Sequence, residues 1–137
     1  MMRRCDVLVI PHDAQRYSTV GDYYTSGSAL RIRISELGNA DYEFLVLLHE
    51  LIESHLCSKS GISEAQITSF DMDHPELDEP GADPRAPYHK QHMFALTIEH
   101  AVAIELGVDW DSYEDRILEV SESGQGPEPP DEELANA

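Results

Sequence analysis

Three residues in the middle of the sequence, His49, Glu50 and Glu53, have the types and the spacing of a metal site. On a helix, His49 and Glu53 stand one turn apart, so their side chains project from the same face. An imidazole nitrogen and a carboxylate oxygen are both accepted zinc ligands. Glu50 is turned by about 100° from His49, where its carboxylate can reach a water molecule beside the ion. The spacing therefore predicts that His49 and Glu53 bind one divalent cation, with Glu50 next to it.

A third ligand must come from another element, and the segment that begins at residue 88 offers several. We expect His92 to be this ligand, because the first pair already supplies a carboxylate and imidazole favours zinc. Glu99 is expected to accept a hydrogen bond from a ligand histidine. The alternatives on the same helical arc, or at the start of the acidic loop before it, are His89, Glu99 itself, His100 and Asp71.

The same residues also permit a purely structural interpretation. A buried histidine and a carboxylate one helical turn apart can form an ion pair that holds their helix against a neighbour. In that case Glu50 would pair with an arginine such as Arg31 or Arg33. Two histidines in expected loops, His12 and His74, are predicted to be solvated.

The element that must position His49 is a helix predicted over residues 41–57. This stretch, "DYEFLVLLHELIESHLC", lacks Gly and Pro and is apolar nearly all round, which is typical of a helix buried on most sides. Asn39 or Asp41 can cap its start, and Gly61 ends it. Charged residues inside such a helix must be paired or bound to a metal, so the buried context strengthens the metal hypothesis.

The remaining patterns predict an α+β fold. Residues 5–11 and 29–35 are expected to be strands, the second with Leu30, Ile32 and Ile34 on its buried face. Helices are expected over residues 62–71, from residue 88 to Gly107, and over 111–120, with a loop or irregular hairpin at 12–27 and a loop at 71–87. We expect a small sheet packed on the central buried metal-bearing helix and on a second long crossing helix. Residues 1–120 should form a single domain and residues 121–137 a disordered acidic tail.

Composition narrows the possible partners. The chain has 137 residues, 27 acidic and 9 basic, and a formal net charge of −18. Such a surface repels phosphate backbones and anionic lipid, so we expect no binding to nucleic acid or membranes. Cations, basic proteins or small molecules are the expected partners. Nothing in the sequence indicates secretion or a membrane span, so we expect a cytoplasmic protein whose cysteines, Cys5 and Cys57, are buried free thiols.

Residues 29–57 resemble part of the zincin metallopeptidases, whose metal-binding helix reads H-E-x-x-H and follows a strand. The resemblance implies a zincin-like fold in which that strand lies beside the substrate cleft and the motif glutamate, here Glu50, is the general base. The sequence departs from the family at Glu53, which replaces the second histidine and adds negative charge. In zincins of the glutamate-ligand subgroup a downstream helix supplies the third ligand, a place that His92 or Glu99 could take. Segments around "LLHELIE", "EPGADPRAPYH" and "LGVDW" also resemble uncharacterised phage and prophage proteins.

Three functions follow as hypotheses. The leading one is a zinc-dependent hydrolase, or one using another divalent cation, that cuts a peptide or amide bond with Glu50 as general base. The second is a non-enzymatic phage interaction protein in which the metal only holds two helices together. The third is a nucleotide pyrophosphohydrolase that binds magnesium through the E-x-x-E pair Glu50 and Glu53. That last family also needs E-x-x-D on a partner helix, which residues 88–106 lack.

Overall fold

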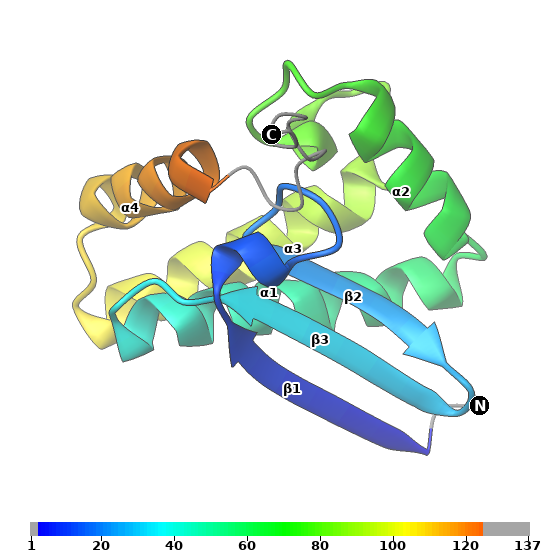
Figure 1. The fold of residues 1–137 in the computed structure, drawn as a ribbon, viewed down its shortest axis with the longest axis horizontal. Coiled ribbons are helices and arrows are strands. Elements are labelled where there is room, and N and C mark those ends of the chain that lie inside the picture. The colour runs from blue at the N-terminus through cyan, green and yellow to red at the C-terminus, as the bar shows by residue number, and fades with distance from the viewer. Residues whose placement is uncertain (1–2, 125–137) are drawn as a thin grey trace, which may run out of the picture.

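A three-stranded sheet packs against a set of helices (Figure 1). In the computed structural model, which describes residues 3–124, the strands are β1 (Arg4–Ile10), β2 (Gly21–Ser26) and β3 (Ala29–Ser35). Their order is β1-β3-β2, with β1 parallel and β2 antiparallel to the central β3. The α-helices are α1 (Ala40–Lys59), α2 (Glu64–Asp73), α3 (His89–Leu106) and α4 (Trp110–Gly124), and short 3-10 turns occupy His12–Ala14 and Pro80–Ala82. The expected α+β class is confirmed.

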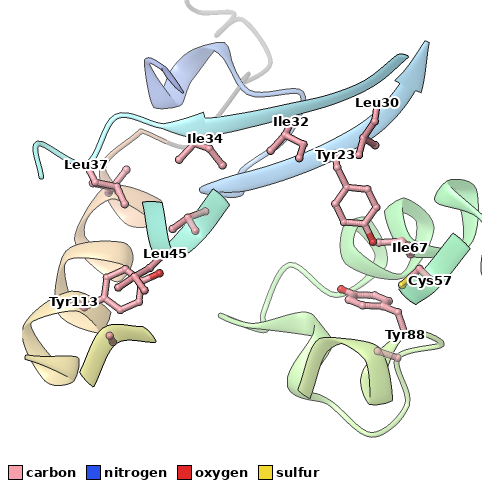
Figure 2. Packing of buried hydrophobic residues seen from close by; sticks show 14 residues of the cluster. Tyr23, Leu30, Ile32, Ile34, Leu37, Leu45, Cys57, Ile67, Tyr88 and Tyr113 are labelled. Atoms are coloured by element: carbon pink, nitrogen blue, oxygen red, sulfur yellow. The ribbon is translucent and has the colours of Figure 1, made fainter. Parts of the chain in front are cut away.

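The alternation of β3 sets which side of the sheet meets the helices. Leu30, Ile32 and Ile34 are at most 8% exposed, whereas Arg31 and Arg33 are only partly buried. Figure 2 shows the three aliphatic side chains pointing from the sheet toward buried residues of the helices. The period-two pattern therefore predicted this face correctly, because a strand with one covered side buries every second residue.

Helix α1 begins and ends at the signals found in the sequence. The Asn39 side chain caps it by accepting hydrogen bonds from the backbone N–H groups of Asp41 and Tyr42. Beyond its last residue, Gly61 adopts a φ of 75°, a left-handed conformation that favours glycine. The helix is less buried than expected, because Phe44 and Leu51 are 46% and 41% exposed. Its buried face instead carries the polar residues that form the candidate site.

Helix α3 packs against α1, and its ends also match the sequence signals. It begins at His89 and ends before Gly107, which has a φ of 70° and lets the chain leave the helix. Together α1 and α3 place residues 49 and 92 within contact distance, although 43 positions separate them in the sequence.

Several boundaries differ from the predictions. The region 12–27 contains strand β2, which pairs with β3 as a hairpin, and α2 extends to Asp73 inside the expected acidic loop. Helix α4 continues to Gly124 rather than stopping at residue 120, because Val120, only 6% exposed, packs into the core and continues the helical turn. The rest of the expected tail, residues 125–137, lies outside the described residues.

The two cysteines have different environments. Both are free thiols, but Cys5 is exposed and only Cys57 is buried. The prediction that both are buried is wrong for Cys5, because β1 is an edge strand that projects beyond the helices. Within residues 3–124, no helix is long and apolar enough to cross a lipid bilayer.

Candidate metal centre

Three atoms from α1 and α3 form a small triangle in the interior. Glu53 Oε2 lies 3.1 Å from His49 Nε2 and 2.8 Å from His92 Nδ1, and the two nitrogens are 3.1 Å apart. A tetrahedral zinc ion with bonds of about 2.0–2.1 Å holds its ligand atoms about 3.3 Å apart. The three side chains are buried, with exposures of 4–8%. His49, Glu53 and His92 thus form a buried group whose geometry could hold a metal ion.

The far nitrogen of each imidazole is already engaged by a carboxylate. His49 Nδ1–H donates to Glu99 Oε1 over 2.7 Å, and His92 Nε2–H donates to Glu79 Oε2 over 2.9 Å. An ionised carboxylate only accepts hydrogen bonds, so a neutral ring that donates to the carboxylate behind it carries its hydrogen on that far nitrogen. The inner nitrogens, His49 Nε2 and His92 Nδ1, then present lone pairs to the centre of the triangle. A carboxylate behind each ligand histidine is the arrangement that orients imidazoles at metal sites.

Glu53 and Glu99 each accept a hydrogen bond from a tyrosine at the oxygen that does not contact His49. The Tyr23 hydroxyl on β2 donates to Glu53 Oε1 over 3.2 Å, which leaves Glu53 Oε2 facing the histidines. The Tyr113 hydroxyl on α4 donates to the second oxygen of Glu99. Both tyrosines are buried, so strand β2 and helix α4 fix the orientation of the site from two sides.

Local backbone geometry brings His92 close to the loop before α3. A Cβ atom added at Gly81 would lie 2.4 Å from Cγ of His92 and 2.8 Å from Cε2 of Tyr88. Real Cβ atoms do not approach that closely, so only glycine lets the 3-10 turn Pro80–Ala82 pack against the imidazole. This close approach fixes the ring that supplies the third inner atom.

The pKa values show how strongly the cluster attracts positive charge. Burial lowers the pKa of His49, but hydrogen bonds to Glu53 and Glu99 outweigh burial and raise it to about 11. Burial also lowers the pKa of His92, while hydrogen bonds to Glu53 and Glu79 raise it to about 9. Burial raises the pKa of Glu53, yet its hydrogen bonds to the two histidines hold it well below its usual range. In the metal-free protein, protons supply the positive charge that a divalent ion would otherwise provide.

Glu50 lies beside the triangle and is not part of it. Among residues 3–124, no group forms a hydrogen bond or ion pair with its carboxylate, which sits against Gly21. Burial, together with the charge of Glu53, raises its pKa above the usual range. The suggested pairing with Arg31 or Arg33 is wrong.

The two arginines face other groups because they project from the opposite side of the sheet. Arg31 pairs with Asp6, and Arg33 donates to backbone carbonyls of Asp6 and Ile32.

The other candidate ligands point elsewhere. His89 Nδ1 hydrogen-bonds to the backbone oxygen of Gly81, and His100 is exposed and stacks on Trp110. Asp71 does fold inward, but its two oxygens accept hydrogen bonds from Tyr17 and Tyr88. Glu99 lies behind His49 and accepts the hydrogen bond that the sequence predicted.

Sequence reasoning missed three residues around the site, Glu79, Tyr23 and Tyr113. Glu79 lies in a proline-rich acidic loop, where no periodicity indicates which carboxylate turns inward. The two tyrosines are separated from the motif by whole elements, so their direction depends on tertiary packing. The signal that could have found Tyr113 is its place on a helix with apolar residues one turn apart, since that face must meet the core.

A cleft of about 830 Å³ contains the candidate site. It is bounded by the loop before β2, by β2 itself, and by parts of α1, α2, α3 and α4. Of the described strands, β2 lines the cleft, whereas β3 contributes no residue to it. The resemblance placed residues 29–35 beside the cleft; β3 is instead the central strand, and the neighbouring hairpin strand takes the edge position.

Comparisons with models of known families, with curated proteins and with solved structures find no match to this chain.

Proposed function

We propose that this protein is a metal-dependent hydrolase of zincin-like type that acts on a peptide or amide bond. Zinc or another divalent cation would be held by His49, Glu53 and His92. One observation carries the proposal: three buried atoms that can serve as metal ligands face one another within 3.1 Å, while carboxylates occupy the outer nitrogens of both rings. Such an arrangement needs positive charge at its centre, which protons supply in the metal-free protein and a divalent ion would supply when bound.

The chain's own residues have clear roles in such a reaction. When bound, the ion supplies Lewis-acid chemistry, since it polarises a carbonyl oxygen and lowers the pKa of water. His49, Glu53 and His92 leave a tetrahedral ion one open position, as catalysis needs. Glu50 lines the same cleft without a hydrogen-bond partner among the described residues, so its carboxylate is available to take a proton from water. It can then return that proton to the leaving amine.

The rival function, a non-enzymatic interaction protein whose ion only joins α1 to α3, uses the same three ligands. A purely structural site needs neither a large cleft nor a carboxylate without a partner beside it. The 830 Å³ cleft and the position of Glu50 therefore favour the hydrolase. A fourth protein ligand would favour the structural role, because structural zinc sites are usually closed.

A nucleotide pyrophosphohydrolase is less consistent with the contacts. That function would need Glu50 and Glu53 to hold magnesium together, but Glu53 faces two imidazoles, which are poor magnesium ligands. The facing helix α3 presents His92 and Glu99 to the site, where an E-x-x-D pair would be required.

The test is a pair of glutamine variants assayed with a fluorogenic peptide mixture on zinc-loaded protein. Glu50→Gln should keep the bound zinc and the thermal midpoint, while hydrolysis falls by about 10²–10⁴-fold because the general base is lost. Glu36→Gln, at an exposed glutamate outside the cleft, is the matched control and should retain hydrolysis. Hydrolysis that survives in Glu50→Gln, or zinc-loaded wild-type protein that cuts no peptide, would contradict the proposal.

A further inference from the structure

We infer that the substrate of this cleft is a basic peptide, with Lys or Arg side chains flanking the bond that is cut. The inference rests on the proposed function and names its substrate class. It follows from the negative charge of the residues that line the cleft and from the apolar side chains that lie between them.

The cleft is lined by acidic residues from nearly every element that bounds it. None of its lining residues in the described part of the chain is a Lys or an Arg. The acidic residues are Asp22, Glu50, Glu53, Glu64, Asp71, Asp78, Glu79, Glu99, Glu114 and Glu122. The ionisable groups of the walls are therefore acidic, apart from the two imidazoles of the candidate metal centre and that of His74.

A divalent ion at the centre would not neutralise this wall. Three of the carboxylates contact the imidazoles at the centre, and Asp22 is neutralised from outside the cleft by two hydrogen bonds from Arg16. Others lie away from the centre, and for Asp78 and Glu114 no ion pair is found among residues 3–124. Because low-dielectric walls focus such charges, the cleft attracts cations and repels phosphates and acidic peptides.

The wall also carries apolar side chains between its acids. On α4, Ile117 and Leu118 line the cleft one turn beyond Glu114, and Met72 on α2 stands beside Asp71. Lys and Arg have apolar stems and charged ends, so they can pack along such a surface while the charge meets a carboxylate. A small inorganic cation would use only the acids and leave the apolar wall uncovered.

The test measures binding of two labelled alanine-glycine peptides to the zinc-loaded Glu50→Gln protein, which should not hydrolyse them. One peptide carries lysines and the other carries glutamates at the same positions. We expect the lysine peptide to bind at least about tenfold more tightly at low ionic strength, with a preference that shrinks as salt is added. Equal binding of the two peptides would overturn the inference.

A matched pair of double variants separates the cleft from the overall charge of −18. Asp78→Asn with Glu114→Gln removes two charges from the cleft wall, whereas Glu105→Gln with Asp115→Asn removes two exposed charges elsewhere on α3 and α4. Since the net charge changes equally, non-specific attraction weakens equally. Only the first pair should lose most of the preference for the lysine peptide; equal losses in both would overturn the inference.

Hydrolysis by the wild-type enzyme distinguishes the two proposals. Cleavage of the lysine and glutamate peptides at equal kcat/KM would overturn the basic substrate class and leave the hydrolase standing. A preference in binding with no cleavage of either peptide would overturn the hydrolase, while the cleft would keep its selectivity for cations.

Discussion

The molecule contains two clusters built around a buried histidine, and the residues next to that histidine differ between them. In the first, His12 Nδ1 lies 2.8 Å from Ser35 Oγ, and the Gln15 side chain donates to Ser35 Oγ and to the backbone oxygen of Arg33. In the second, His49 lies between Glu53 and Glu99. Both histidines are nearly inaccessible, with exposures of 8% and 6%.

The difference lies in the charge of the neighbours. Burial lowers the pKa of His12, since the one hydrogen-bond partner of its ring among the described residues is the uncharged Ser35 hydroxyl, and the charge of Asp13 raises the pKa by less. The carboxylates around His49 raise its pKa to about 11 despite the burial. A buried histidine is therefore a metal candidate when the groups that face it can only accept hydrogen bonds, and a structural residue when they are neutral hydroxyls and amides.

The largest expected effect separates the two clusters by their response to zinc. His49→Ala should abolish zinc binding and with it a stabilisation of about 2.7 kcal/mol at a hundredfold excess of ion over Kd. His12→Ala should lower the thermal midpoint yet keep the upward shift on adding zinc, because its cluster binds no ion. Thermal denaturation with and without zinc measures both. An equal zinc shift in His49→Ala would contradict the assignment.

The next effect concerns the carboxylate behind His49. Glu99→Gln replaces an acceptor by a group that can also donate, so His49 is held less firmly in the tautomer that presents Nε2. Zinc affinity should fall by about 10–100-fold, as measured by competition with a chelator. Glu105→Gln, six residues further along α3, is the control and should leave the affinity unchanged. An unchanged affinity in Glu99→Gln would show that the hydrogen bond does not support the site.

A smaller effect is expected behind His92. The Glu79 side chain is 46% exposed, against 7% for Glu99, so solvent weakens its interaction with the imidazole. Glu79→Gln should therefore reduce zinc affinity by about tenfold, the lower end of the range for such residues. The same chelator competition compares the two variants directly. A larger loss for Glu79→Gln than for Glu99→Gln would reverse the order that burial implies.

The smallest effect is the share of the pH dependence of stability that comes from the first cluster. The folded-state pKa of His12 lies below 6.5, so the unfolded chain binds a proton first as the pH falls. The stability that neutral His12 contributes is present above 6.5 and is lost as the pH drops below that value. His12→Gln should lose less stability than wild type between about pH 7 and pH 5, measured by urea denaturation. Parallel pH profiles would exclude His12 as the cause.

The sequence predicts a site residue well when that residue lies on a helix or strand, because the repeat of the element then shows which way its side chain points. The one-turn spacing of His49 and Glu53 and the polar stripe on α3 were enough to bring His92 to the same centre. Glu79 could not be predicted, because an irregular loop has no repeat that orients its side chains. His12 was expected to be exposed to solvent. It is buried instead, because its Nδ1 forms a hydrogen bond with Ser35 Oγ at the end of β3.

The fold shows the same division between local and tertiary information. Caps and stops at Asn39, Gly61 and Gly107 act within a few residues, so the ends of α1 and α3 could be predicted. Strand β2 was expected only as part of a loop or irregular hairpin, because its sequence, "GDYYTS", has little aliphatic alternation and is stabilised by pairing with β3. The assignment of residues 1–120 to a single domain stays a prediction.

The central claim is that one divalent ion sits between α1 and α3, and its stoichiometry is the most direct measurement. Elemental analysis of wild-type protein purified without an affinity tag should find about one zinc, or another divalent metal, per chain. The His49→Ala protein should contain none. Wild-type protein that carries no metal and gains no thermal stability from added zinc, manganese or iron would contradict the claim, and the triangle of His49, Glu53 and His92 would be an ion-pair cluster that joins two helices.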